Sequence, residues 1–359
     1  MDAGADVDSL ARARLVWILK GPNAGDYGQL RVLASALGAP HVEKQLVFRT
    51  WELLLHAAPH PTLAGLDRSA SDPLDPPWPD LLLTAGRRNE LVARWVRDAS
   101  GGKTRLVHLG RPWSNPARFD LVVSNRQYFL AASDNVVVND LPLTDLAPES
   151  LELERATWGA KWTNLPRPWI AVLVGGDAGP LVFTPRRARE LARWIDARIA
   201  RSGGSVLLTT SGRTPPGSAD ALLAALHSNG FVYRWPSREA NPYRGLLACG
   251  DEFIVTADSM SMLAETCATG KPVHLFDFSD AAQGWRTRSA YHWKPLVHRL
   301  VMSVGPMRMR RDLDRIHAAL LAAGRIRRLD APAQTVMIPS PGPADDLTRT
   351  VERVRALFD

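Results

Sequence analysis

Short apolar runs alternate with amphipathic helical patterns along most of this sequence. Runs rich in leucine and β-branched residues predict a first series of strands at 14–20, 41–48, 80–86, 103–110, 119–124 and 134–139. Helices are predicted from Tyr27 to about Leu37 and near 87–99, and the proline-rich stretch from Pro59 through Pro79 is expected to be a surface loop. Because strands that alternate with helices form βαβ units, the pattern predicts a parallel sheet.

The alternation starts again after the prolines Pro166 and Pro168, which we take as a linker. A second series of strands is predicted at 169–176, 205–212, 231–236, 252–259 and 271–278, with a helix over 184–204. We therefore predict an α/β fold with two doubly wound, Rossmann-like parallel-sheet domains. The predicted parts are an N-terminal domain (1–165), a C-terminal domain (166–340) and a C-terminal helix (341–359) that packs back on the body.

The composition is that of an average globular protein, with 45% hydrophobic and 23% charged residues. No run reaches the roughly 18 to 20 apolar residues of a membrane-spanning helix, and the start MDAGADVDSL lacks the order of a signal peptide, so we expect a cytoplasmic protein. Cys249 and Cys267 are expected to be buried thiols. The net charge of +7 attracts phosphorylated substrates, anionic membranes or nucleic acid, but without a recognisable module we expect no specific nucleic-acid binding.

Ligands of parallel sheets bind at the carboxyl ends of the strands, so the turns after the strands are the places to search for function. The first is GPNAGDYGQ (21–29), in which Gly21 and Gly25 permit close approach of the backbone. Asp26 lies where the helix begins and is a candidate for a chemical role. The structural alternative is a capping box, because Gln29 follows Asp26 by three residues at the predicted start of a helix.

Two further turns offer groups that suit a phosphate. VGGDAGP (174–180) contains adjacent glycines, Gly175 and Gly176, which let a diphosphate or sugar approach the main chain. TTSGRTP (209–215) offers the hydroxyl of Ser211 and the guanidinium of Arg213. Each turn alone is a common feature of α/β proteins.

The fourth turn lies within EFIVTADSMSMLAETCATGKPVHLF (252–276). A helix is predicted to begin near Asp258 or Ser259, and its first amides would face an anion. Ser261 and Glu265 are four residues apart and share one helical face. Glu265 is able to accept hydrogen bonds from two ribose hydroxyls, and the alternative is a surface glutamate paired with arginine or lysine.

The segment TADSMSMLAETCATGKPVHLF resembles the donor-binding signature of GT-B glycosyltransferases. From WILKGPNAGDYGQ onward the chain is similar to the Elm-type family of predicted glycosyltransferases, whose plant members are mitochondrial-fission factors. The resemblance implies a GT-B fold, in which the two parallel-sheet domains face a cleft. It also implies a nucleoside-diphosphate sugar as substrate, no cofactor and no metal. It implies that Glu265 binds the ribose and that the other donor contacts are Gly175, Gly176, Ser211, Arg213, Asp258, Ser259, Ser261 and Met262.

On the acceptor side, GPNAGD takes the place of the glycine-rich loop of peptidoglycan glucosaminyltransferases. Those enzymes end the loop in histidine, where this chain has Asp26. The resemblance thus implies Asp26 as the catalytic base and an acceptor-side loop formed by Gly21, Asn23, Gly25 and Gln29.

We therefore expect an inverting, metal-independent transfer to an envelope glycan or a lipid-linked acceptor. A nucleotide-sugar epimerase has the same architecture and stays open, as does a non-catalytic, membrane-associated adaptor of the mitochondrial-fission type. The segments 284–299 and 307–311 interleave aromatic and basic residues. Three interpretations stay open for these segments: peripheral contact with the inner face of an anionic membrane, where a lipid-linked acceptor is presented, stacking on nucleic acid, or ordinary exposed arginines.

Overall fold

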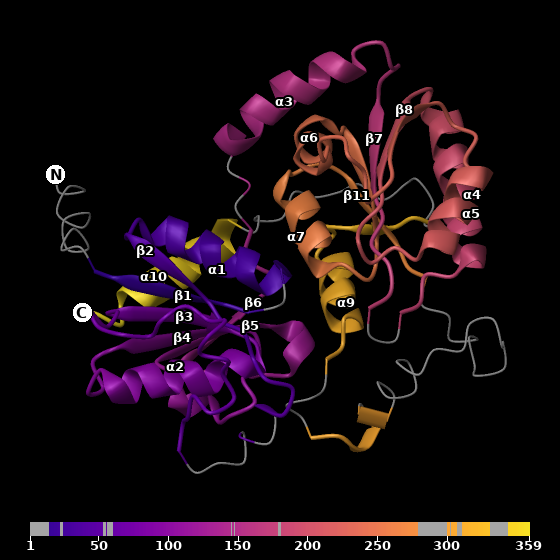
Figure 1. Cartoon of the computed structure of the whole chain (residues 1–359). Helices are drawn as coiled ribbons and strands as arrows, with labels where there is room; N and C mark the ends of the chain where they lie inside the picture. The colour runs from indigo at the N-terminus through magenta and orange to yellow at the C-terminus, as the bar shows by residue number, and fades with distance from the viewer. Residues whose placement is uncertain are drawn as a thin grey trace. The chain divides into compact units, whose positions relative to one another are not determined.

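The structure, a computed structural model, divides the chain into two compact units (Figure 1). Unit 1 comprises Met1–Thr144, Pro306–Arg311 and Ala344–Asp359, and unit 2 comprises Asp145–Gly305 and Asp312–Pro343. The structure describes residues 14–21, 24–52, 55, 60–144, 146, 148–178, 181–278, 300–301, 303–306, 311–330 and 344–359.

Unit 1 contains a six-stranded parallel sheet with the strand order β2-β1-β3-β4-β5-β6. The strands are β1 (Val16–Lys20), β2 (His41–Gln45), β3 (Leu81–Ala85), β4 (Arg105–Leu109), β5 (Leu121–Asn125) and β6 (Val136–Asn139). Successive side chains point to opposite faces, so Ile18 packs with α1 (Ala24–Leu37) and α10 (Ala344–Arg355), while Leu19 packs with α2 (Arg87–Ala99). Figure 1 shows α1 and α10 on one face of this sheet and α2 on the other.

Unit 2 contains a second six-stranded parallel sheet with the order β12-β11-β10-β7-β8-β9. Its strands are β7 (Trp169–Leu173), β8 (Ser205–Thr209), β9 (Gly230–Tyr233), β10 (Glu252–Thr256), β11 (Val273–Phe276) and β12 (Arg327–Arg328). In β7, β8 and β10 every residue is buried, because helices cover both faces. The helices are α3 (Pro148–Trp162), α4 (Pro185–Ser202), α5 (Pro216–Ala225), α6 (Tyr243–Cys249), α7 (Met260–Ala268) and α9 (Asp314–Ala322).

These two sheets confirm the predicted α/β class with two doubly wound parallel-sheet units. The predicted helix over 184–204 is also present, since α4 begins after the N-cap Thr184 and ends at Gly203, whose φ is 71°. Within the described ranges, no helix has both the length and the apolar character that crossing a membrane requires. Cys249 is buried as expected, and Cys267 is half-buried, with burial raising the pKa of its thiol to about 12.

The chain divides before α3 and not at the proline pair near residue 166. The reason is packing: α3 lies against α6, and a Cβ at Gly245 of α6 would overlap the ring of Trp158. Trp158 and Trp162 are both buried, and each ring contacts Phe231 of β9. The C-terminal helix α10 packs on unit 1, where Val351 and Val354 join the core of α1 and the sheet.

Each sheet has one point at which the strand order reverses. In unit 1 the chain passes from β1 outward to β2 and then continues with β3 on the other side of β1. In unit 2 it runs from β7 to β9 in one direction and returns with β10 on the other side of β7. The carboxyl ends at these switch points are where doubly wound proteins bind ligands.

Candidate functional site

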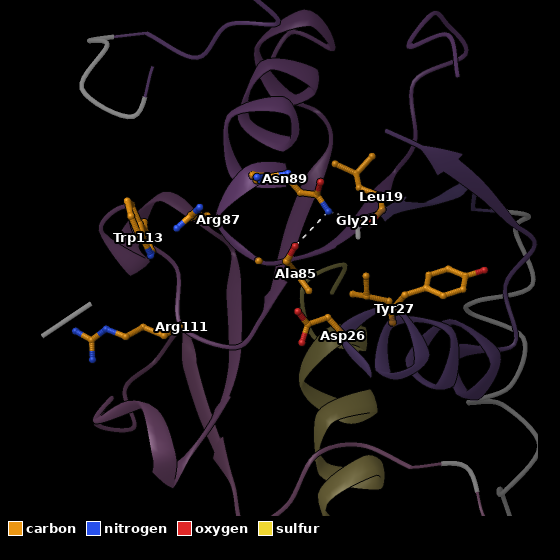
Figure 2. A pocket seen from close by; sticks show the side chains of 12 residues that line it. Leu19, Gly21, Asp26, Tyr27, Ala85, Arg87, Asn89, Arg111 and Trp113 are labelled. Carbon is orange, nitrogen blue, oxygen red and sulfur yellow. Dashed lines mark hydrogen bonds between the residues drawn. The ribbon is translucent and has the colours of Figure 1, made fainter. Parts of the chain in front are cut away.

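A cavity of about 540 Å³ lies at the switch point of unit 1. Its lining comes from three strand ends and two helix starts, and includes Asp26, Gly86, Arg87, Asn89, Arg111 and Trp113. In Figure 2, Asp26 lies on the side of α1, and Arg87, Trp113 and Arg111 lie on the other side. A volume of this size is typical of small-molecule sites.

Asp26, the predicted base, lies in the first turn of α1, which begins at Ala24 and thus earlier than predicted. A Cβ placed on Gly86 would be 3.9 Å from Oδ2 of Asp26, so the carboxylate lies beside the N-cap of α2. A negative charge is favourable there.

The capping-box alternative is wrong. Oε1 of Gln29 accepts a hydrogen bond from the backbone N of Leu143 at 3.2 Å, and Nε2 of Gln29 donates to the carbonyl of Gly25 at 3.5 Å. Gln29 therefore ties α1 to the chain after β6 and does not close a capping box with Asp26. Gly21 lines the cavity, whereas Asn23 lies outside the described residues.

The arginines of this cavity were not among the residues predicted from the sequence. Arg87 follows β3 and Gly86, and Arg111 follows β4 and Gly110, so the order strand, glycine, arginine occurs twice. Both glycines have positive φ, 73° and 90°, which turns the chain sharply at the strand end. The same order precedes Arg213 in unit 2, and this repetition was the signal that could have found the cavity.

The three predicted turns of unit 2 meet at its own switch point. The backbone N of Gly175 donates to Oγ1 of Thr256 at 2.8 Å, and that of Gly176 donates to Oδ2 of Asp258 at 2.9 Å. Nη2 of Arg213 lies 2.9 Å from the same carboxylate oxygen. The ends of β7, β8 and β10 are thus joined around one buried carboxylate.

Gly175 and Gly176 are required by this packing. A Cβ on Gly175 would lie 2.1 Å from Oδ2 of Asp258, and one on Gly176 would lie 1.9 Å from the carbonyl oxygen of Arg213. The sequence analysis had explained the glycines by room for a diphosphate. The structure gives a different reason, because protein atoms fill the space that each missing side chain leaves.

Asp258 is fully buried, whereas the side chain of Arg213 is 45% exposed. Burial raises the pKa of the Asp258 carboxyl, and Arg213 and the hydroxyl of Thr256 oppose this rise. Ser211 shapes the same turn, because its Oγ accepts from the backbone N of Arg213 at 3.3 Å. The arrangement fixes one edge of the guanidinium and leaves other donors open to solvent.

Helix α7 begins as predicted, with Ser259 as its N-cap and no side-chain cap bond. Ser261 and Met262 lie in its first turn and are half-buried. Glu265 is also half-buried, and its Oε2 accepts a hydrogen bond from the hydroxyl of Tyr243 on α6. Burial raises the pKa of Glu265, and the hydrogen bond from Tyr243 and the charge of Arg244 oppose this rise.

The predicted aromatic and basic segment 284–299 lies outside the described residues, as do 307–310. Arg311 belongs to unit 1, where its Nε donates to Oε1 of Gln127 at 2.6 Å. Among the side chains that the structure describes, no three of His, Cys, Asp and Glu gather as a metal ion would require.

Comparison with known proteins shows the family. The family model described as Mitochondrial fission ELM1 matches residues 24–357. The chain is 28% identical over 219 residues to the mitochondrial fission protein ELM1 of Arabidopsis thaliana, covering 55% of this chain and 51% of that protein, so it spans about half the length of that relative. It is 22% identical over 303 residues to the uncharacterized protein RP120 of Rickettsia prowazekii (strain Madrid E), covering 73% and 82%.

Two solved structures illustrate more distant similarity. The UDP-GlcNAc 2-epimerase of Neisseria meningitidis, bound to UDP-GlcNAc, aligns with a TM-score of 0.47 and 10% identity over 95% of this chain and 91% of that one. The MurG of Acinetobacter baumannii aligns with a TM-score of 0.41 and 11% identity, over 96% and 99%.

Proposed function

This chain belongs to the mitochondrial fission ELM1 family, and we propose that it is a GT-B glycosyltransferase. It moves a sugar from a nucleoside-diphosphate sugar to an envelope glycan or a lipid-linked acceptor. The main support is the strand-end edge of unit 2, where an anchored arginine and a helix N-terminus without a side-chain cap lie together. Such an edge suits a diphosphate.

The donor is held by groups of unit 2. Arg213 and the first amides of α7, at Ser259, Ser261 and Met262, contact the diphosphate. Glu265 accepts hydrogen bonds from the ribose hydroxyls, and Tyr243 orients its carboxylate. The remaining predicted donor residues, Gly175, Gly176, Ser211 and Asp258, shape the turns that present Arg213.

The transfer is a direct displacement with inversion. Asp26 takes the proton of an acceptor hydroxyl, the oxygen forms a bond to the anomeric carbon, and the bond from that carbon to the diphosphate breaks. The nucleoside diphosphate leaves with its negative charge, which Arg213 and the amides of α7 neutralise. With these groups in place, the proposed reaction needs neither a metal nor another cofactor.

Titration of the full chain with nucleoside diphosphates and their sugars tests the donor site. A true donor raises the melting temperature and binds in calorimetry. Arg213→Ala and Glu265→Gln are each expected to weaken binding about tenfold, or ~1.4 kcal/mol. The matched controls Arg238→Ala and Glu239→Gln, both exposed in unit 2, should bind normally. If no such compound binds, the proposal is wrong.

Two other functions give different outcomes in the same assays. An epimerase forms a new epimer from nucleotide sugar alone, without an acceptor. A non-catalytic adaptor, favoured by the name of the Arabidopsis relative, binds no donor. The glycosyltransferase binds donor, forms no epimer and loses turnover in Asp26→Asn while donor affinity is kept. We also propose that the protein works at the inner face of the membrane, where its net charge of +7 favours an anionic surface.

A further inference from the structure

The cavity of unit 1 contains positive charge that the proposed transfer does not use. Arg87, Arg88 and Arg111 line it, together with the single acidic residue Asp26. Nε of Arg88 lies 2.9 Å from Oε1 of the buried Glu52, so its charge is already paired. The unpaired positive charge comes from Arg87 and Arg111.

Neither arginine forms an ion pair with an acidic side chain in the part of the chain that the structure describes. The guanidinium of Arg87 lies over the ring of Trp113, 4.9 Å from its centroid. Nη1 of Arg111 donates to the carbonyls of Tyr128 and Phe129 at 2.6 and 3.2 Å. Aromatic faces and carbonyl oxygens position a guanidinium without cancelling its charge.

The backbone that holds these arginines is itself constrained. Phe129 has a φ of 56°, an unfavourable conformation for a residue with a side chain, and it directs its carbonyl to Arg111. On the other side, the buried carboxylate of Glu90 accepts from the backbone N of Trp113 at 2.6 Å and of Ser114 at 3.0 Å. The loop after β4 is thus fixed against α2.

The start of α2 faces the same cavity. Its N-cap Gly86 makes no side-chain cap bond, and Gly86 and Asn89 both line the cavity. Asn89 is 1% exposed, and its Nδ2 donates to the carbonyls of Leu19 and Ala85 at 3.0 and 3.2 Å. Its Oδ1 has no hydrogen-bond partner among the described residues. The carboxamide of Asn89 thus ties the start of α2 to the ends of β1 and β3.

We propose that this cavity binds a phosphate monoester on the acceptor, so that the acceptor of the proposed transferase is a phosphorylated sugar or a lipid that ends in one. Arg87, Arg111 and the first amides of α2 hold the phosphate. Asp26 faces a hydroxyl of the same molecule. That the bound molecule is the acceptor rests on the proposed function. Binding of a phosphate monoester in the cavity does not depend on it.

A phosphate fits better than a carboxylate. The donors belong to three groups, namely the first amides of α2, the ring-stacked side chain of Arg87 and the carbonyl-held side chain of Arg111. A phosphate monoester presents three oxygens to three such donors, whereas a carboxylate presents two. The volume of about 540 Å³ admits a hexose phosphate.

The test measures binding of glucose 6-phosphate to the full chain, with localisation by hydrogen exchange. Binding should protect the backbone at 86–89 and 111–114. Arg87→Ala and Arg111→Lys should each weaken it about tenfold. Arg118→Ala makes the same change of charge on an exposed arginine of unit 1 that does not line the cavity, and it should bind within about twofold of the wild type.

Further ligands and variants distinguish a lipid-borne phosphate from a soluble one. They also distinguish the cavity of unit 1 from the proposed donor site of unit 2. A lipid-borne phosphate is supported if the chain binds phosphatidylcholine vesicles only when they contain phosphatidic acid, and if Arg87→Ala loses that binding. A soluble phosphorylated sugar is supported if the chain binds glucose 6-phosphate but not these vesicles. Equal affinity for glucuronate, or unchanged affinity in Arg87→Ala, overturns the inference. Arg213→Ala should keep glucose 6-phosphate binding, so the cavity inference stands even if no nucleotide binds to unit 2.

Discussion

The two units both place charged groups at the switch point of a parallel sheet, but their strand orders differ and they use the space at that point differently. In unit 1, between β1 and β3, a cavity of about 540 Å³ stays open in front of Gly86. In unit 2, between β7 and β10, Asp258 and the backbone of Arg213 fill the space in front of Gly175 and Gly176. The ligand that we propose for unit 1 would enter a cavity, whereas the donor that we propose for unit 2 would bind to the exposed edge of an arginine that Asp258 already holds.

Each of the two sites depends on a buried carboxylate of its own unit. Asp258 lies at the site of unit 2 and forms an ion pair with Arg213. Glu90 does not line the cavity of unit 1, but it accepts a hydrogen bond from the backbone N of Trp113 and so fixes the loop that carries Arg111. The difference explains why one site keeps its volume and the other does not. It also predicts that similar substitutions will have unequal effects in the two units.

The largest expected effect is that of Gly176→Ala. Its new Cβ would lie 1.9 Å from the carbonyl oxygen of Arg213, a backbone atom that moves only with β8 and its turn. We expect a loss of more than about 3 kcal/mol in the free energy of unfolding of unit 2, measured by denaturant titration with hydrogen exchange to locate the change.

The matched control is Gly217→Ala in α5, where nothing lies within 4 Å of the added atom. It should be neutral or slightly stabilising. If Gly176→Ala were as stable as this control, the turn of Arg213 would have moved to admit the added atom at little cost. The turns of unit 2 would then be no more tightly packed than the cavity of unit 1.

The sequence predicted the fold far better than the sites. Buried parallel strands are continuous apolar runs, so β7, β8 and β10 were recognisable, as were the caps of α4. The domain boundary was not, because the pattern of α3 does not say against which core Trp158 and Trp162 will pack. The order strand, glycine, arginine was visible at Arg87 and Arg111, but only the folded sheet brings the two turns together.

A second prediction is that the stability of unit 1 falls at low pH because of a buried histidine of that unit. His108 of β4 is fully buried, and neither ring nitrogen has a hydrogen-bond partner in the described part of the chain. Burial lowers its pKa from 6.5 to about 3. Between these values the unfolded chain binds the extra proton, so unit 1 loses stability as the pH falls, by ~1.4 kcal/mol per pH unit.

His108→Leu should remove this dependence. Between pH 6 and 4 the difference between variant and wild type should grow by roughly 2 to 3 kcal/mol in favour of the variant. Hydrogen exchange of unit 1 measures it, and exchange of unit 2 serves as the internal control. Parallel pH profiles for both proteins would mean that His108 is protonated in the folded state.

Gly86→Ala tests the openness of unit 1. Gly86 has a φ of 73° and a ψ of 151°, a region that residues with a side chain rarely adopt, but an added Cβ meets nothing closer than Asp26 at 3.9 Å. The cost should therefore be only the backbone strain, about 2 kcal/mol in the free energy of unfolding of unit 1. Gly28→Ala in α1, with ordinary φ and open space, is the control. A loss as large as that of Gly176→Ala would mean that the cavity is closed in solution.

The smallest expected effect is that of Glu90→Gln, which tests whether the carboxylate of Glu90 is needed to hold the loop at 111–114. The side-chain amide of this variant would turn its NH₂ group toward the backbone N of Trp113 or Ser114, so one hydrogen bond is lost and the free energy of unfolding of unit 1 falls by about 1 kcal/mol. The loop at 111–114 should exchange faster, and the affinity for glucose 6-phosphate should fall. Asp98→Asn, exposed on the same helix, controls for the change of charge. Unchanged exchange at 111–114 would show that Tyr128 and Phe129 hold Arg111 without help from Glu90, and the parallel with Asp258 would then fail.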